Sequence, residues 1–262
     1  MNEKTNYGNW VPEKALYLLF GLAAVFLTIT ILLGVFAQIP VLTIIMGVVF
    51  VLTLIMAVYM LVCHETFAFE KGNMMADVHK HLVEHLEWNG EGTLLDIGCG
   101  AAALTVRCAK AFPKAQITAM DYWGAEWNYA KEQCEKNARI EGVADRITFQ
   151  KGDAAKLDFA DETFDAAVSN FVFHEVHSAK DKRDVVREAL RVVKKGGAFS
   201  FQDMFSQKAL YGDMDAFVKQ LKAEGISEIH YIGNLEKKLD AIPGFVATPW
   251  MISGMGIIYG KK

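Results

Sequence analysis

The fold of this chain is decided by residues 94–103, Leu94-Leu95-Asp96-Ile97-Gly98-Cys99-Gly100-Ala101-Ala102-Ala103. An apolar, strand-like run breaks at two closely spaced glycines, and a helix-like run follows. In α/β proteins, a strand, a glycine turn and a helix in this order let the backbone approach a nucleotide-like cofactor. The stretch therefore predicts an α/β domain with a cofactor site at the carboxyl end of this strand.

An acidic residue follows at the spacing that such a site needs. Asp121 closes the next strand-like run, 116–120, where a carboxylate accepts hydrogen bonds from ribose hydroxyls. The segment Gly98-x-Gly100-x-x-Ala103 also satisfies the dinucleotide fingerprint. These residues alone leave two classes open, a methyl-transfer enzyme and a nicotinamide-dependent dehydrogenase.

The excess of apolar residues lies near the N-terminus. The chain is 52% hydrophobic, and its mean hydropathy is +0.18. Residues 15–37 and 41–63 are uncharged runs, each long enough to cross a hydrocarbon core of about 30 Å at about 1.5 Å per residue. Only Gln38-Ile39-Pro40 separates them. The pattern predicts a transmembrane helical hairpin; the alternatives are a cleaved signal peptide, whose apolar run is shorter, and a buried hairpin in a soluble oligomer.

Lysines around the hairpin predict its orientation. Lys4 and Lys14 precede it, Lys71 and Lys80 follow it, and the turn carries no charge. Because such a bias marks the cytoplasmic side, both ends are expected in the cytoplasm. The apolar runs hold no ionisable residue, which favours an anchor over a transport path. The expected organisation is an N-terminal cytoplasmic segment (1–14), a transmembrane hairpin (15–63), a linker with the first helix of the catalytic domain (64–92), and a cofactor-binding domain (93–262).

Charge and cysteine usage argue against two kinds of partner. The net charge of −4 and the pI near 6.0 provide no general basic face for nucleic acid. The four cysteines form no CxxC pair and no zinc-like spacing with histidine. No metal site is expected, and the thiols are expected to be reduced.

Strand and helix patterns alternate through the rest of the chain. Strands are predicted at 93–97, 116–120, 147–151, 164–169, 198–203, 227–232 and 254–259. Helices are predicted at 74–88, 103–111, 126–141, 182–193 and 214–224, with Lys194-Lys195-Gly196-Gly197 ending the fourth. This order predicts a doubly wound, mostly parallel seven-stranded sheet. The last two strands, which lack a long helix between them, are expected to pair antiparallel at one edge.

Five motifs follow one another in a familiar order. They are Asp96-Ile97-Gly98-Cys99-Gly100, Asp121 in AMDYWG, 145–154, 164–170 and 187–197. In these motifs the chain, over residues 74–262, resembles the class I S-adenosylmethionine-dependent methyltransferases. The resemblance implies a Rossmann-like fold, S-adenosyl-L-methionine (SAM) as the cofactor, and methyl transfer. The sequence departs from the family at Ala102, where a third glycine is common.

The resemblance also implies roles for the first two motifs. Gly98 and Gly100 would line the methionine part of SAM, and Asp96 would lie near its amino group. Asp121 would bind the ribose diol.

The adenine side of the cofactor is assigned in the same way. Tyr122 and Trp123 would cover the adenine face, Asp153 would accept from its amino group, and Ala154 would contribute backbone. Asn170, at the end of the fourth strand, would meet the cofactor through its backbone or amide. Asp96 and Gly152-Asp153-Ala154 favour SAM over a dinucleotide.

Residues after the fourth strand are candidates for acceptor chemistry. His174 and Glu175 lie where ligands enter such sheets and could orient or deprotonate an acceptor, and Asp203 is a candidate for the pocket wall. The function expected is a membrane-anchored SAM-dependent methyltransferase acting on a small molecule or lipid. The alternatives are a membrane-tethered SAM-binding or scaffold protein without turnover, and an NAD(P)-dependent oxidoreductase.

Overall fold

In a computed structural model, the chain forms two compact units, residues 9–75 and residues 1–8 with 76–262. The structure describes residues 3–69, 74–123 and 131–262. The first unit holds the apolar helices and the second holds the sheet. Each unit is described by itself below.

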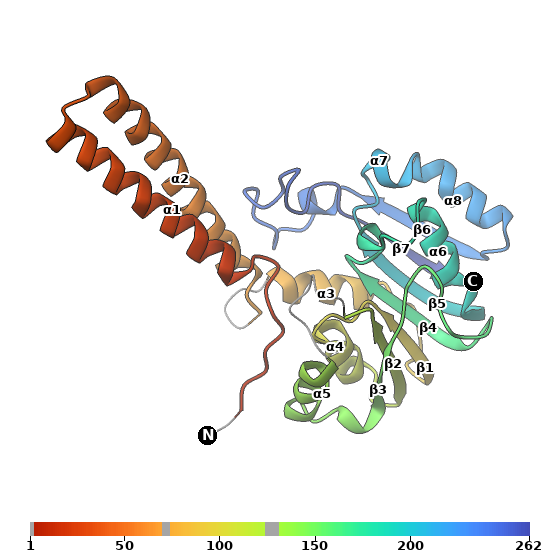
Figure 1. Cartoon of the computed structure of the whole chain (residues 1–262). Coiled ribbons are helices and arrows are strands. Elements are labelled where there is room, and N and C mark those ends of the chain that lie inside the picture. The colour runs from red at the N-terminus through yellow and green to blue at the C-terminus, as the bar shows by residue number, and fades with distance from the viewer. Residues whose placement is uncertain (1–2, 70–73, 124–130) are drawn as a thin grey trace. The chain divides into compact units, whose positions relative to one another are not determined.

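The first unit is a helical hairpin, as predicted (Figure 1). Its first helix, α1 (Glu13–Leu32), continues into a π-helical turn, η1 (Leu33–Ala37), and α2 (Pro40–Phe67) runs back beside it. The chain reverses at Gln38, which is left-handed with a φ of 52°. By length and composition, both helices could cross a membrane.

Small side chains bring the two helices of the hairpin together. A Cβ added to Gly34 would lie 3.2 Å from Thr43 Cγ2, and one added to Gly47 would lie 3.7 Å from Thr30 Cγ2. Larger apolar side chains such as Leu52 point outward and are exposed. An apolar exterior of this extent fits a lipid environment or a protein partner.

Polar contacts organise the base of the hairpin. The Asn9 side-chain amide donates to the His64 carbonyl at 2.8 Å, and His64 Nδ1 lies 2.7 Å from the Val11 carbonyl. The rings of Trp10 and Phe67 lie 5.2 Å apart. The residues before α1 are thereby joined to the last turns of α2.

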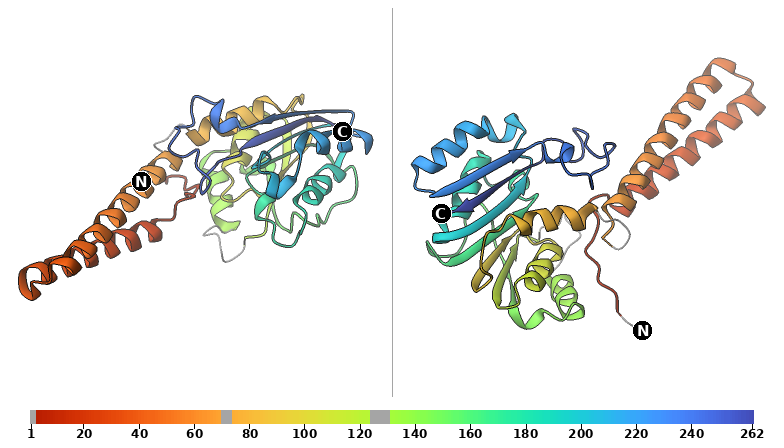
Figure 2. Two further views of the ribbon diagram at one scale, coloured as in Figure 1. Left: turned by 90° about the horizontal axis from the view of Figure 1, so that it is seen from above. Right: turned by 180° about the vertical axis from the view of Figure 1, so that it is seen from behind.

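The second unit is built on a seven-stranded sheet in the order β3-β2-β1-β4-β5-β7-β6 (Figures 1 and 2). The strands are β1 (Gly92–Ile97), β2 (Ala115–Asp121), β3 (Ile147–Lys151), β4 (Phe164–Asn170), β5 (Val193–Asp203), β6 (Glu228–Gly233) and β7 (Gly256–Lys261). The first five are parallel, and β7 runs antiparallel to both β5 and β6. The predicted doubly wound sheet with an antiparallel final pair is confirmed.

Helices cover the sheet on both faces, and each face has its own apolar core. One face carries α3 (Met74–Glu84), α4 (Ala103–Ala111) and α5 (Lys131–Ile140), and the other carries α6 (Lys182–Arg191), α7 (Lys208–Tyr211) and α8 (Met214–Ala223). Short 3₁₀ turns are η2 (Ala144–Arg146), η3 (Phe173–Glu175) and η4 (Leu235–Lys237). Of the helix predicted at 126–141, residues 126–130 lie outside the described residues.

Several predicted boundaries are wrong, most of them by one or two residues. The helix predicted at 74–88 ends at Glu84, and the largest difference lies at the start of β5. Residues 194–197 do not end a helix but form the first part of β5, and α6 stops at Arg191. The Gly196 N–H donates to the Lys262 carbonyl at 2.7 Å, and the Lys262 N–H donates to the Gly197 carbonyl at 3.0 Å. Pairing with the end of the chain therefore outweighs the local helix-stop signal.

The order of the strands places a topological switch point between β1 and β4. The chain leaves β1 toward β2 and β3, and later leaves β4 toward β5 on the other side, so the connections diverge at this point. Ligands bind at such switch points in open α/β sheets. Gly98 lies there with a φ of 74°, and a Cβ added to it would overlap the Val172 side chain.

Candidate functional site

The glycine turn after β1 is held by the end of β2. The N–H groups of Gly98 and Cys99 both donate to the Met120 carbonyl, at 2.8 and 3.0 Å. Gly100 has a φ of 55° and Ala102 a φ of 69°, so alternate residues of the turn are left-handed. The turn leads directly into α4, whose first turn of backbone N–H groups faces the carboxyl edge of the sheet.

Asp121 closes this turn with its carboxylate. Its Oδ2 accepts from the Gly100 N–H at 2.9 Å, and its Oδ1 accepts from the Trp123 N–H at 2.8 Å. Burial raises the pKa of Asp121, and these backbone N–H groups oppose that shift. A carboxylate offers about four lone-pair sites, so it can bind a diol while still holding the turn.

Asp96, near the end of β1 and just before the glycine turn, is buried. Its Oδ2 accepts from the Thr105 hydroxyl at 2.5 Å. Among the described residues, its Oδ1 has no hydrogen-bond partner. Burial raises the pKa of Asp96 to about 7. A buried, half-satisfied carboxylate of this kind is suited to a cationic group on a ligand.

The two aromatic residues after Asp121 lie differently. Trp123 is left-handed with a φ of 43°, and its indole N–H donates to the Gly100 carbonyl at 3.2 Å, so its ring covers the glycine turn. Tyr122 is 65% exposed, and the Lys151 ammonium lies 5.4 Å from its ring centroid. Of the two side chains, that of Tyr122 is the more exposed.

Asp153 and Ala154 follow β3 at the same edge of the sheet. Asp153 Oδ1 accepts from the Ala155 N–H at 2.8 Å and from the Ser178 hydroxyl at 3.0 Å. Ala154 is buried in the core beneath. The Ser178 contact joins the end of β3 to the loop that follows β4.

Asn170, at the end of β4, is fixed by a polar network. Its Oδ1 accepts from the Gln202 amide at 2.9 Å, and its Nδ2 lies 3.1 Å from His79 Nε2 on α3. Burial lowers the pKa of His79 to about 3, so its ring is neutral and accepts from Asn170. The sequence patterns did not single out Gln202 or His79, because their roles depend on how α3 packs on the sheet.

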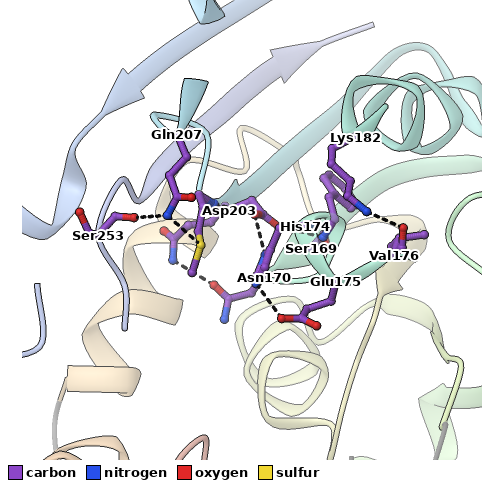
Figure 3. Close-up of polar contacts among 12 residues, drawn as sticks. Ser169, Asn170, His174, Glu175, Val176, Lys182, Asp203, Gln207 and Ser253 are labelled. Atoms are coloured by element: carbon purple, nitrogen blue, oxygen red, sulfur yellow. Dashed lines mark hydrogen bonds and ion pairs between the residues drawn. The ribbon is translucent and has the colours of Figure 1, made fainter. Parts of the chain in front are cut away.

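His174, Glu175 and Asp203 form an ion cluster at the ends of β4 and β5 (Figure 3). His174 Nδ1 lies 2.8 Å from Asp203 Oδ1, and His174 Nε2 lies 3.2 Å from Glu175 Oε1. Burial by itself would lower the pKa of His174, but the charge and hydrogen bond of Asp203, together with Glu175, raise it to about 10. The structure therefore places His174 between Asp203 and Glu175.

A segment at the start of the chain also reaches the site. Residues 3–8, here called the strap, are tied to α5 through Asn137, a buried residue that sequence patterns did not reveal. The Asn6 N–H donates to Asn137 Oδ1 at 2.9 Å, and Asn137 Nδ2 donates to the carbonyls of Asn6 and Ala101 at 2.7 and 2.9 Å. Asn137 thus links the strap to the glycine turn.

Comparisons with known proteins agree with this geometry. Residues 95–201 match the family model of a methyltransferase domain. A sterol 24-C-methyltransferase of Aspergillus fumigatus is 30% identical over 136 residues, 52% of this chain and 34% of that protein. A sterol 24-C-methyltransferase of Gibberella zeae is 28% identical over 198 residues, 67% of this chain and 49% of that protein. The chain spans half or less of these two relatives.

A solved structure shows the same fold. The structure of a geranyl diphosphate methyltransferase in complex with SAM has a TM-score of 0.55 and 16% sequence identity, and the match covers 71% of this chain and 85% of that one. The fold is that of an α/β protein with a glycine turn at its topological switch point, the place where such folds bind nucleotide-like cofactors. Over residues 95–201 the chain carries a methyltransferase domain, and the curated relatives that match it are methyltransferases, enzymes that use SAM as their cofactor.

Proposed function

We propose that this protein is a membrane-anchored enzyme that methylates a lipid or another small apolar acceptor, reached from the cytoplasmic surface. SAM, when bound, supplies a methyl group made electrophilic by a positively charged sulfur. The protein's own part is to hold the acceptor in line with that group, because positioning provides much of the rate in a displacement of this kind.

The observation that carries the cofactor assignment is the unpartnered oxygen of Asp96. This Oδ1 is buried without a partner in the described part of the chain, whereas Oδ2 is bonded to Thr105. An unpaired buried charge is costly, and the ammonium group of SAM's methionine part would satisfy it. A nicotinamide dinucleotide has no corresponding ammonium group.

The other cofactor contacts in the proposal follow the carboxyl edge of the sheet. Gly98 and Gly100 would lie against the methionine part, and Asp121 would hold the ribose diol with its remaining lone pairs. The adenine ring would lie toward the ends of β3 and β4, among a set of residues that share this edge. These are Tyr122, Trp123, Asp153, Ala154 and Asn170.

The membrane location and the acceptor class rest on two further observations. Within the described residues, two helices could span a membrane by length and composition, and their outward side chains are apolar. The relatives described above are named for methylation of sterols, which are apolar molecules. An anchor would keep the catalytic domain, on the cytoplasmic side, close to a membrane-resident acceptor.

The test is methyl transfer by the purified full-length protein in detergent. The protein is incubated with methyl-labelled SAM and, separately, with host membranes and with soluble extract. Label is expected in the lipid fraction of the membrane sample. Label in protein or only in soluble metabolites would contradict the acceptor class, and binding of SAM without release of S-adenosylhomocysteine would indicate a protein without turnover.

Two variants control this experiment. Asp121→Ala should weaken SAM binding at least about tenfold, since a lost charged hydrogen bond costs about 1.5–3 kcal/mol. Asp158→Ala, at an exposed carboxylate, should leave it unchanged. Calorimetry with NAD tests the alternative cofactor. Tight binding of NAD without binding of SAM would overturn the proposal.

A further inference from the structure

In the ion cluster of His174, Glu175 and Asp203, Asp203 is buried and fixed, whereas Glu175 is exposed to solvent. Asp203, 1% exposed, is fixed by backbone donors: its Oδ2 accepts from the Phe173 N–H at 2.8 Å, and its Oδ1 accepts from the Met204 N–H at 2.6 Å. The same Oδ1 lies 2.8 Å from His174 Nδ1. Asp203 therefore fixes the orientation of the His174 ring.

The outer nitrogen of His174 meets a weaker partner. Its Nε2 lies 3.2 Å from Glu175 Oε1, which is long for a charge-assisted hydrogen bond. The Glu175 side chain is 42% exposed, against 14% for His174. Glu175 can therefore turn into solvent at low cost, leaving the Nε2–H group free to donate to a ligand.

The charge state of His174 argues against a role as a base. With a pKa of about 10, the ring is an imidazolium at neutral pH, and both of its nitrogens carry protons. Its surroundings keep it so: Asp203 lies on one side, with the Tyr211 hydroxyl near that carboxylate, and Glu175 lies on the other. A neutral ring would be needed to accept a proton at Nε2.

The other charged groups near Glu175 do not replace His174. Lys182 donates to the carbonyls of Val176 and Ala179, at 2.6 and 3.2 Å (Figure 3). The hydrogen bond with His174 lowers the pKa of Glu175, burial opposes that shift, and the charges of His177 and Lys182 lower the pKa further. Glu175 is thus an ionised carboxylate that occupies the position beside His174 Nε2.

We propose that an acceptor with an ionisable oxygen, a phenol or an enol, places this oxygen on His174 Nε2–H in exchange for Glu175, with Asp203 as a positioning residue. This proposal rests on the proposed function and names its acceptor class. The acceptor O–H bond breaks, its proton passes to solvent water, and the remaining oxyanion accepts the hydrogen bond from the imidazolium. The exchange replaces one negative charge by another, so the cluster keeps its charge balance. A neutral alcohol would not restore that balance. A phenolate or an enolate would, and either its oxygen or its ortho or α carbon is then a nucleophile.

The test uses 4-nitrophenol, whose ionised form is seen by its absorbance, with the full-length protein in detergent and S-adenosylhomocysteine present. No methyl transfer is possible in this mixture, so the readout is binding alone. The wild-type protein is expected to bind the phenolate and lower the apparent pKa of the bound phenol. Binding of the neutral phenol, or a raised pKa, would overturn the proposal.

Two variants test the roles of His174 and Glu175. His174→Gln should weaken phenolate binding at least about tenfold. Glu175→Gln, at an exposed position that does not threaten folding, should strengthen it severalfold because a competing anion is removed. Equal or weaker phenolate binding by Glu175→Gln would overturn the exchange, even if His174→Gln failed to fold.

The test also separates this proposal from the proposed function. Calorimetry of S-adenosylhomocysteine binding, made on the same samples, reports the cofactor site. Loss of cofactor binding with phenolate capture intact would contradict the proposed function alone. Cofactor binding without phenolate capture would contradict the acceptor assignment alone.

Discussion

Ala102 is fully buried in the glycine turn and left-handed, with a φ of 69°. A residue with a side chain in this conformation costs about 1–2 kcal/mol. Glycine avoids this cost, but it loses more backbone entropy on folding, so the net gain from glycine is smaller. Ala102→Gly is therefore expected to stabilise the protein by up to about 1 kcal/mol, and Ala102→Val to destabilise it by more than about 2 kcal/mol. The measurement is thermal unfolding in detergent. Ala109→Gly, in the ordinary helix α4, is the matched control and should destabilise by about 1 kcal/mol.

Asp96 is expected to make SAM binding depend on pH. Its pKa of about 7 in the unbound protein means that the carboxylate is protonated at low pH. Because the ammonium group of SAM binds the ionised form, SAM affinity should rise from pH 5.5 to about 7.5, and it should fall above about pH 8 as the α-amino group loses its proton. Calorimetry across this range checks the profile. Asp96→Asn should flatten the acid side, and an unchanged acid side would point to the other raised carboxyl, Asp121.

The site residues divide by how local their signals are. Gly98, Gly100 and Asp121 could be predicted because a strand, a tight turn and a following strand end fix their positions within a short stretch of chain. The network of His79, Asn170 and Gln202 could not be predicted in full, since it joins α3, β4 and β5 across 91 and 32 residues of sequence. The protonated state of His174, in η3, likewise depends on Asp203, which lies at the end of β5.

At the scale of elements, periodic patterns predicted what lies inside each element better than how it ends. The bounds of α4 match the prediction because the glycine turn begins it and the end of its apolar pattern stops it. The end of α6 did not match, since Gly196 and Gly197, which follow it, pair with Lys262, the last residue of the sequence. A strand recruited by a distant partner carries no local signal of that partner.

The hairpin helices allow a prediction at the same scale. Leu52, near the middle of α2, is 61% exposed in the structure. In a bilayer, a lysine near the centre of a helix costs about 2.5–3.5 kcal/mol, whereas an exposed lysine in water costs little. Leu52→Lys is therefore expected to reduce the membrane-bound fraction of the protein in cell fractionation, and Leu52→Ala is not. Full membrane recovery and unchanged stability of Leu52→Lys would favour a hairpin that lies in water.

At the scale of the whole molecule, the strap connects the start of the chain to the cofactor turn. Asn137→Ala removes the bonds to Asn6 and Ala101 and leaves their backbone groups unpaired. It is expected to lower the free energy of unfolding by about 2–4 kcal/mol and to weaken SAM binding severalfold. Tyr7→Phe removes only the hydroxyl that donates to Glu141, and it should cost about 1 kcal/mol or less without affecting SAM. Chemical denaturation and calorimetry measure both effects, and equal losses in the two variants would contradict the link to the turn.

During synthesis, residues 3–8 emerge before the hairpin, and their partner on α5 emerges well after it. The strap can close only when the later part of the chain has folded, by which time a hairpin anchored as proposed is already in the bilayer. Closure then requires the strap and α5 to be on the same side, which holds only for an even number of crossings. A chain inserted with one crossing would keep Asn6 from Asn137, and the carbonyl of Ala101 would lose a partner. Completion of the cofactor turn would in this way report on correct membrane insertion.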